Sequence, residues 1–316
     1  MSGPRQARVR ALAKINLDLR VLGKRPDGYH ELRTIFQTIS LADTIDIAFT
    51  PARASSIEME DPLAIPDNLA ARAARLAMDA MRVTGKVRIR LAKRIPLGAG
   101  LGGGSSDAAA VLLALPVLAG RVLDTTRMCE LGQQLGSDVP FFLLGGTGVG
   151  IGRGSEVFPL PESPVGSAAR RGVLVAPGMQ VSTVEAYRRL SPHLTTESQQ
   201  NKIFSFQAHT WKLGSEACPQ NDFEAVVFEQ HGRLATLKKK LMGAGASVAL
   251  MSGSGSAVFG LFRTSDEVSR AIRLLGDETT FRISLVSGAR YRRMWWRALE
   301  QHIDGRVWPP RSRNAR

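Results

Sequence analysis

Hydrophobic and polar positions alternate over much of the first hundred residues, which is the period of a β-strand with one buried face. Residues 9–21 alternate in part, residues 34–49 form a second β-rich run, and residues 87–91 alternate cleanly. Between the first two runs, Gly, Pro and Asp gather in residues 23–28, where proline sets φ and glycine permits positive φ. The first hundred residues are therefore expected to be mainly β-structure, with a turn at residues 23–28.

A helical spacing of apolar residues begins after Asn68, where Leu69, Ala73 and Leu76 fall near one face of a helix. Asp67 or Asn68 is suited to the N-cap, because its side-chain oxygen can accept a backbone N–H. Further helices are expected at residues 108–115, 183–190, 222–231, 233–242 and 265–275. Further strands are expected at residues 173–176, 248–251 and 257–262. The mixture predicts an α+β protein.

The length of 316 residues suggests two domains, at roughly 150 residues per domain. Pro, Ser, Gly and Arg dominate residues 159–172, which is the best candidate for a domain boundary. We therefore expect an N-terminal domain at residues 1–162, a C-terminal domain at 163–289 and a basic tail at 290–316. No internal repeat of fixed period is present.

Composition excludes several classes of protein. With 44% hydrophobic and 22% charged residues, the chain is neither disordered nor fibrous. Residues 108–119 are the longest nearly apolar stretch, and they are too short to span a bilayer. No apolar segment follows the first arginines, so we expect no secretory signal, no membrane partner and a cytoplasmic location. Cys129 and Cys218 are too few and too far apart for a disulfide scaffold or a zinc ribbon.

The net charge of +14 is concentrated at the chain ends. Residues 1–10 carry +3 and residues 290–316 carry +6, which leaves +5 for the rest. Charge in terminal segments is typical of solvated or partly disordered tails, so we do not expect nucleic acid as a partner. Three tryptophans in the second segment leave a docking role open: Trp295, Trp296 and Trp308.

Five glycines within residues 98–104 precede a strongly helical segment. Each glycine costs backbone entropy on folding, so stability does not explain the cluster. Backbone N–H groups without side chains can approach an anion closely, and the following helix adds the positive end of its dipole. Ser105 and Ser106 would add hydroxyl donors, and Asp107 is a favourable acid for the first helical turn. The segment predicts a phosphate site.

The common phosphate motifs do not describe this loop. No GxxxxGK[ST] is present, which excludes a P-loop NTPase. Gly98, Gly100 and Gly103 fit GxGxxG, but Asp124, the only acid at the right distance for a dinucleotide site, begins a helical stretch instead of ending a strand. No HRD or DFG follows, which excludes a protein kinase.

Residues 96–108 resemble the second sequence motif of the GHMP kinase superfamily. Residues 13–17 resemble its first motif, and residues 243–247 with 252–256 resemble its third. The resemblance covers residues 11 to about 262. It implies a ribosomal-protein-S5-like βα domain with a left-handed βαβ unit, then a ferredoxin-like domain. It also implies that ATP is bound by Pro96, Leu97, Gly98, Ala99, Gly100, Leu101, Gly102, Gly103, Gly104, Ser105 and Ser106, with Asn68 at the adenine.

Three segments are similar to one branch of this superfamily: residues 24–32, 102–107 and 135–141. That branch transfers the γ-phosphoryl group of ATP to the 2-hydroxyl of cytidine diphospho-methylerythritol, in the non-mevalonate route to isoprenoids. Two alternatives stay open. Another GHMP kinase, acting on mevalonate, homoserine or a sugar, would share the glycine motifs. A nucleotide- or nucleic-acid-binding protein would use the basic tail.

The resemblance also assigns roles to residues outside the glycine loop. Asp138 would be the general base and Lys14 its partner. The substrate residues would be Asn16, Tyr29, His30, Thr183 and Tyr187, with the aromatic rings on the cytosine and the imidazole hydrogen-bonded to it. We expect Mg²⁺ to enter as MgATP without an assigned protein ligand. The protein is expected to be a monomer or a weak homodimer.

Overall fold

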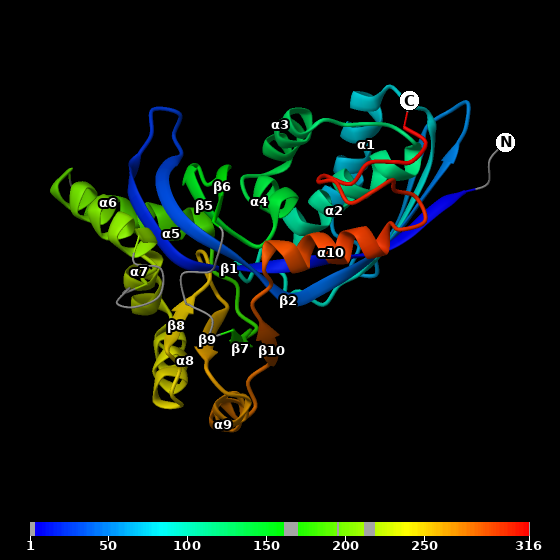
Figure 1. The fold of residues 1–316 in the computed structure, drawn as a ribbon. Helices are drawn as coiled ribbons and strands as arrows, with labels where there is room; N and C mark the ends of the chain where they lie inside the picture. Colours follow the sequence, from blue (N-terminus) through cyan, green and yellow to red (C-terminus); the bar gives the residue numbers. More distant parts are fainter. Residues whose placement is uncertain (1–3, 161–169, 195, 212–218, 316) are drawn as a thin grey trace.

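The computed structural model describes residues 4–160, 170–194, 196–211 and 219–315 (Figure 1). Its larger sheet has six strands: β1 (Arg5–Lys24), β2 (His30–Pro51), β3 (Ser56–Glu60), β4 (Gly85–Ala92), β5 (Thr147–Gly152) and β6 (Glu156–Leu160). β1 pairs with β2 along nearly its whole length. The other edge of β2 is shared, because β5 pairs with its first half and β4 with its second half. All neighbours are antiparallel except β3 and β4.

Helices α1 (Leu69–Met81), α2 (Gly103–Ala119), α3 (Thr125–Leu135) and α4 (Val139–Leu144) pack with this sheet in one hydrophobic core. α2 is buried from Ser106 to Leu118, so it is apolar on all sides as a central helix should be. α1 follows the strand β3 and leads to the parallel strand β4. Of the two predicted N-cap candidates, Asn68 is the N-cap, and its side chain accepts the N–H of Ala70.

The second sheet has four antiparallel strands in the order β10-β7-β9-β8: β7 (Arg171–Val175), β8 (Val248–Met251), β9 (Val258–Phe262) and β10 (Thr280–Ser284). Its helices are α5 (Thr183–Leu190), α6 (Thr196–Trp211), α7 (Phe223–Gln230), α8 (Gly232–Gly243) and α9 (Ser265–Leu275). A short 3₁₀ helix, η1 (Ser191–His193), follows α5. This strand order is that of a ferredoxin-like domain, which confirms the predicted α+β fold.

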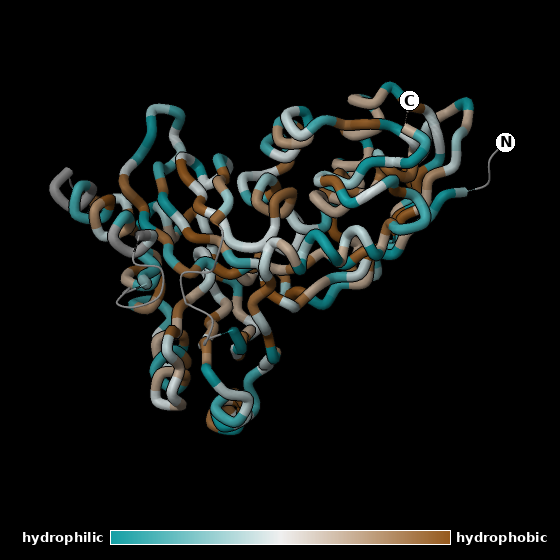
Figure 2. Tube along the Cα trace, viewed as in Figure 1, coloured by the Kyte–Doolittle hydropathy of each residue, from teal (hydrophilic) through white to brown (hydrophobic). Residues whose placement is uncertain are grey.

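The two sheets share a core. One face of the smaller sheet packs against α5, α7, α8 and α9. Its other face packs against the middle of β1 and β2, where Ile15, Leu17 and Ile35 lie in the same cluster as Leu174 and Phe259. Figure 2 shows hydrophobic residues along these strands, whereas the turn between β1 and β2 is hydrophilic. The shared core fixes one domain against the other and so fixes the cleft between them.

The predicted helices and strands are confirmed to within a few residues, but the structure also has elements that were not predicted, among them β3, β5, β6, β10 and α4. The helix α6 was not expected, and its apolar pattern is weak. The predicted domain boundary after residue 162 lies among residues 161–169, outside those described, and stays a prediction. No helix in the described part of the chain has the length and apolarity that crossing a membrane requires.

The prediction of a solvated C-terminal tail is wrong. Residues 288–298 form the helix α10 (Gly288–Ala298), which lies along β1 (Figure 1). Tyr291, Trp295 and Leu299 are buried in the core of the larger sheet, and Trp308 donates its indole N–H to the carbonyl of Leu143 at 3.1 Å. These three buried residues recur every fourth position and so lie on one face of the helix. Most of the arginines between them face water on the opposite side, so their charge does not prevent packing.

The packed C-terminal segment makes a prediction for stability. Replacing Trp295 by Ala removes a buried aromatic side chain, so we expect the free energy of unfolding to fall by about 3–5 kcal/mol. Urea unfolding followed by circular dichroism measures this change. The matched control is Arg293→Ala on the exposed face of α10, expected to change stability by less than about 0.5 kcal/mol. Equal stability of the two variants would contradict the packing of α10.

Candidate active site

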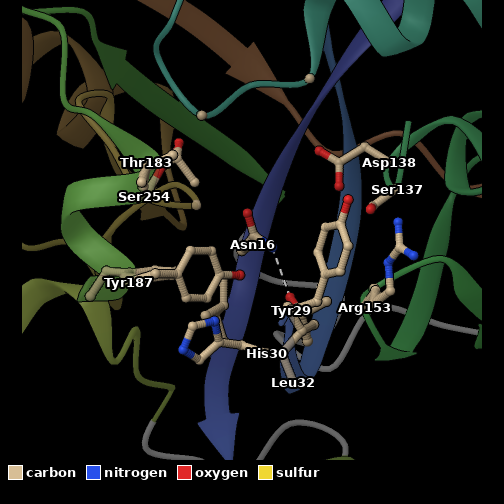
Figure 3. Close-up of a pocket in the computed structure, with 18 of the residues that line it drawn as sticks. Asn16, Tyr29, His30, Leu32, Ser137, Asp138, Arg153, Thr183, Tyr187 and Ser254 are labelled. Atoms are coloured by element: carbon tan, nitrogen blue, oxygen red, sulfur yellow. Dashed lines mark hydrogen bonds between the residues drawn. The ribbon is translucent and has the colours of Figure 1, made fainter. Parts of the chain in front are cut away.

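A cleft of about 750 Å³ lies between the two domains. Figure 3 shows its residues: Tyr187, Thr183 and Ser254 stand on one side, Asp138, Ser137 and Arg153 on the other, and Asn16 between them on β1. Both domains therefore contribute to one site. The structure brings together every predicted catalytic and substrate residue in this cleft.

Lys14 and Asp138 meet at the centre of the cleft. Lys14 is only 4% exposed, and its Nζ lies 3.5 Å from Oδ2 of Asp138. The same ammonium donates to Oδ1 of Asn16 at 2.8 Å and lies 5.4 Å from the ring centroid of Phe36. Asp138 immediately precedes α4, and its side chain makes no capping hydrogen bond there. Its carboxylate pairs with Lys14, and because it is about one-third exposed it remains accessible to a ligand.

An irregularity in β1 helps to place Lys14. The pairing of β1 with β2 shifts register between Leu12 and Lys14 and again between Asn16 and Asp18. Such bulges change which way side chains point and free backbone groups from the ladder. The N–H of Lys14 donates to the carbonyl of Leu101 at 3.0 Å, so the strand holds the glycine loop directly.

The glycine loop is also held by the C-terminal domain. Ser252 donates its hydroxyl to the carbonyl of Gly100 at 2.9 Å, and the N–H of Ala257 donates to the carbonyl of Ala99 at 3.2 Å. A Cβ on Gly100 would lie 2.0 Å from the carbonyl oxygen of Ser252, so only glycine fits. Segment 252–257 therefore clamps the loop, whereas residues 243–247 form the turn between α8 and β8.

The loop ends at the N-terminus of α2, where the backbone offers donors. The N-cap is Gly102, with φ of 68° and no side chain to accept the first N–H groups of the helix. A Cβ on Gly102 would lie 2.8 Å from the ring of Phe142, so packing requires this glycine. Gly104 differs, because a Cβ there would make only an ordinary 3.5 Å contact with Leu69. Packing therefore does not explain the missing side chain at Gly104.

Not every predicted donor of the loop is available. The hydroxyl of Ser106 donates to the carbonyl of Leu12 at 2.7 Å, and its N–H donates to the carbonyl of Gly102. Since Ser106 is also buried, the prediction that it donates a hydroxyl to phosphate is wrong. Ser105 is half-buried and stays a candidate. Asn68 caps α1 and donates its amide to Asp61, and its contact with adenine stays a prediction.

A buried charge cluster underlies the first turn of α2. Nζ of Lys93 lies 2.5 Å from Asp43 and 2.8 Å from Asp107. Burial alone would lower the pKa of Lys93, but the two carboxylates together raise it. Burial raises the pKa of Asp107 to about 7, and Asp43 adds to this while Lys93 opposes it. Oδ1 of Asp107 is buried without a hydrogen-bond partner, which costs less when the carboxyl is neutral. Sequence spacing does not reveal this cluster.

Aromatic side chains line the end of the cleft far from the glycine loop. His30 stacks on Tyr187 with 4.4 Å between ring centroids, and its Nε2 lies 2.9 Å from Oγ of Ser191. Burial lowers the pKa of His30, and the nearby Lys24 adds to this. Burial, assisted by the charge of Asp138, raises the pKa of Tyr187 to about 12. Both rings are therefore neutral near pH 7. The predicted hydrogen bond from His30 to a base requires its other nitrogen or a turn of the ring.

Three other predicted residues contribute to the same cleft. Tyr29 is half exposed, and the guanidinium of Arg153 lies 3.7 Å from its ring centroid. Asn16 donates its amide to Oγ1 of Thr34 at 2.7 Å while accepting from Lys14. The hydroxyl of Thr183 lies 2.7 Å from that of Ser254. Sequence analysis missed the lining residues Arg153, Ser137, Ser191 and Ser254, although Ser254 lies within the third motif.

Comparison with known proteins gives consistent matches. The family model for the GHMP kinases N terminal domain matches residues 68–146, and that for the GHMP kinases C terminal matches residues 205–278. The chain is 66% identical over 317 aligned positions to a 4-diphosphocytidyl-2-C-methyl-D-erythritol kinase of Solibacter usitatus, covering 99% of each chain. The alignment includes the C-terminal segment that folds as α10.

Solved structures give the same result. The crystal structure of a 4-(cytidine 5'-diphospho)-2C-methyl-D-erythritol kinase superposes with a TM-score of 0.73 at 37% identity, covering 88% of this chain and 98% of that one. A homoserine kinase from Cytophaga hutchinsonii superposes with a TM-score of 0.65 at 16% identity, covering 91% and 98%. The second similarity shows the fold alone.

The buried cluster beneath α2 makes a prediction for pH dependence. The folded chain retains the proton of Asp107 up to about pH 7, whereas an unfolded aspartate releases it near pH 4, so this carboxyl destabilises the fold as pH rises through that interval. Asp107→Asn removes the titration. Between pH 4.5 and 7.5, the free energy of unfolding of the wild type should fall by about 1–3 kcal/mol relative to the variant. Urea titrations at several pH values measure this; parallel profiles would contradict the raised pKa.

Proposed function

The chain belongs to the 4-diphosphocytidyl-2-C-methyl-D-erythritol kinases of the GHMP kinase family, and from this we propose how its cleft works. The protein is a small-molecule kinase that transfers the γ-phosphoryl group of ATP to the 2-hydroxyl of 4-diphosphocytidyl-2-C-methyl-D-erythritol. The observation that carries the catalytic assignment is the buried Lys14 at 3.5 Å from Asp138, beside the N-terminus of α2. Phosphoryl transfer needs positioning and charge stabilisation of this kind.

Asp138 is proposed as the general base. Its accessible carboxylate accepts the proton of the substrate hydroxyl as that oxygen attacks phosphorus. Lys14 holds the Asp138 carboxylate in place and offsets negative charge on the transferred group. Asn16, which accepts from Lys14, orients the same hydroxyl group or its neighbour. The three side chains therefore act as one hydrogen-bonded unit on the acceptor.

The glycine loop is proposed to hold the phosphates of ATP. The open N–H groups of the first turn of α2 and the positive end of its dipole face the cleft at Gly102. Ser105 adds a hydroxyl at that turn. The remaining predicted residues, from Pro96 to Leu101, shape the loop, and Asn68 is proposed to approach the adenine. Because Ser106 is committed to Leu12, it serves to fix α2 to β1.

The cytidine end is proposed to lie among the aromatic residues. Tyr29, His30 and Tyr187 offer flat surfaces and a neutral imidazole, and Thr183 adds a hydroxyl group. Mevalonate and homoserine carry no base on which these rings could stack. The basic tail does not support a nucleic-acid-binding function either, because its aromatic residues are folded into the core.

Magnesium is proposed to enter with ATP. No group of three or more His, Cys, Asp or Glu residues with metal-binding geometry occurs among the described residues, and Asp138 supplies the only carboxylate lining the described part of the cleft. These residues fit an ion held mainly by phosphate oxygens and water. Bound there, Mg²⁺ would neutralise phosphate charge. We further propose a cytoplasmic location, since ATP is the co-substrate, and a monomer or weak homodimer.

An acceptor panel tests the reaction. The purified protein with MgATP should release ADP with 4-diphosphocytidyl-2-C-methyl-D-erythritol and not with mevalonate, homoserine or galactose.

Asp138→Asn should lower kcat by about 10²–10⁴-fold, because it removes the base, while the KM for ATP stays within threefold. Near-normal turnover of this variant, in a protein with wild-type circular dichroism, would remove Asp138 from the mechanism.

Gly104 provides a test of the phosphate site. Gly104→Ala meets no steric obstacle within the protein and raises helix propensity, so thermal stability should be unchanged or higher. If ATP phosphates approach the backbone there, the added methyl group should raise the KM for ATP about tenfold or more. The KM for the acceptor serves as the internal control and should change little. An unchanged KM for ATP would place the phosphates elsewhere.

A further inference from the structure

Arg153 occupies an unusual position at the wall of the cleft. Its guanidinium lies over the ring of Tyr29 with 3.7 Å between Cζ and the ring centroid, and its Nε is buried without a hydrogen-bond partner. Arg153 is in the turn between β5 and β6, and the adjacent Gly152 pairs with Leu32 of β2. The sheet therefore carries Arg153 to Tyr29, and the contact does not depend on a free loop.

Arg153 has no ion-pair partner among the described residues, although its charge adds to the Tyr29 N–H and Arg25 in lowering the pKa of Asp27. Arg25 and Arg33, near the same turn, both form ion pairs with Glu31. Arg188, on the opposite wall, pairs with a carboxylate of its own helix. No ion pair joins Arg153 to a carboxylate across the described ranges of the chain. A partly desolvated cation without a carboxylate in contact is costly, so an anionic ligand in contact with the guanidinium would relieve the cost.

The cleft as a whole favours an anion. Four of its lining residues carry a positive charge: Lys14, Lys24, Arg153 and Arg188. Asp138 is the single acidic residue that lines the described cleft, and it is already paired with Lys14. Lys24 acts on the opposite side, since its charge lowers the pKa of His30. Arg153 is therefore the unpaired cation that shares a wall with Asp138 (Figure 3).

We propose that Arg153 binds the diphosphate of the cytidine substrate and holds Tyr29 flat for the base, a role that rests on the proposed function. Figure 3 shows Tyr29 between Arg153 and Tyr187, so one face of its ring is covered by the guanidinium and the other faces the cleft. A pyrimidine on the open face places its diphosphate between the base and Asp138. Only the planar, forked guanidinium can stack on a ring and also donate to two phosphate oxygens.

Truncated ligands separate this role from simple support of Tyr29. Binding of cytidine, CMP and CDP is measured by calorimetry for the wild type, Arg153→Ala and Arg153→Lys. Arg153→Ala should weaken CDP about tenfold to a hundredfold and cytidine less than threefold, because only CDP carries the groups that the guanidinium contacts. Arg153→Lys should recover part of the loss for CDP, because it retains the charge. Arg33→Ala is the matched control, since Arg33 lies near the same turn but is paired with Glu31 and does not line the cleft, and it should leave the ratio of CDP to cytidine affinity unchanged.

The possible results are distinguishable. A selective loss for CDP that shrinks at high ionic strength supports the proposal. An equal loss for cytidine and CDP shows that Arg153 only supports Tyr29 and overturns it, as does unchanged CDP affinity in Arg153→Ala. A wild type that binds none of the three ligands overturns the proposed substrate and this inference with it. The KM for ATP should stay within twofold in every variant, which verifies that the phosphate loop is intact.

Discussion

The pairing of β1 with β2 connects every part of the molecule. β1 alone contributes to three hydrophobic clusters: Val9 and Leu12 lie in the core of the larger sheet, Ile15 and Leu17 in the core shared by the sheets, and Leu19 and Val21 in the core of the smaller domain. A strand has one register with its neighbour, so these contributions cannot shift independently. The irregularities near Lys14 occur midway along this strand, where the two domains meet, so the proposed catalytic lysine stands on a segment that both domains constrain.

The active site combines this rigidity with charges that are costly to bury. Lys14 is almost fully buried, yet it has the carboxylate of Asp138 and the amide oxygen of Asn16 as partners. The cluster of Asp43, Lys93 and Asp107 beneath α2 is less well compensated, since it holds two carboxylates for one ammonium. Burying charge in this way costs stability, and the charge of Lys14 can repay that cost by stabilising a bound anion or a transition state.

The spacing of apolar residues predicted most of the helices and strands. It did not predict contacts between residues that lie far apart along the chain. Alternation and helical spacing located β4 and α5 because each buries one face, whereas β1, which is buried on both faces over residues 11–23, alternates only in part. The resemblance to the GHMP kinase motifs predicted that Lys14, Asp138 and the glycine loop lie in one site, because these motifs occur together in that superfamily. Arg153 and Tyr29 lie more than a hundred positions apart, and nothing in the neighbourhood of either predicts their contact. The C-terminal segment was predicted to be solvated because of its arginines, although its buried aromatic residues recur at helical spacing. The role of Ser106 could not be predicted, because a hydroxyl group at the start of a helix can also bond to a neighbouring strand.

The packing of α10 against the larger sheet has a consequence for synthesis on the ribosome. The N-terminal strand and the helix α2 emerge early, but Tyr291, Trp295, Leu299 and Ile303, which complete the same core, are made more than 150 residues later. Until then the nascent chain exposes apolar surface to water, which is unfavourable and promotes aggregation. The larger domain, though first in sequence, thus becomes complete only after the smaller domain has been translated, and an interrupted translation leaves both the core and the catalytic cleft unfinished.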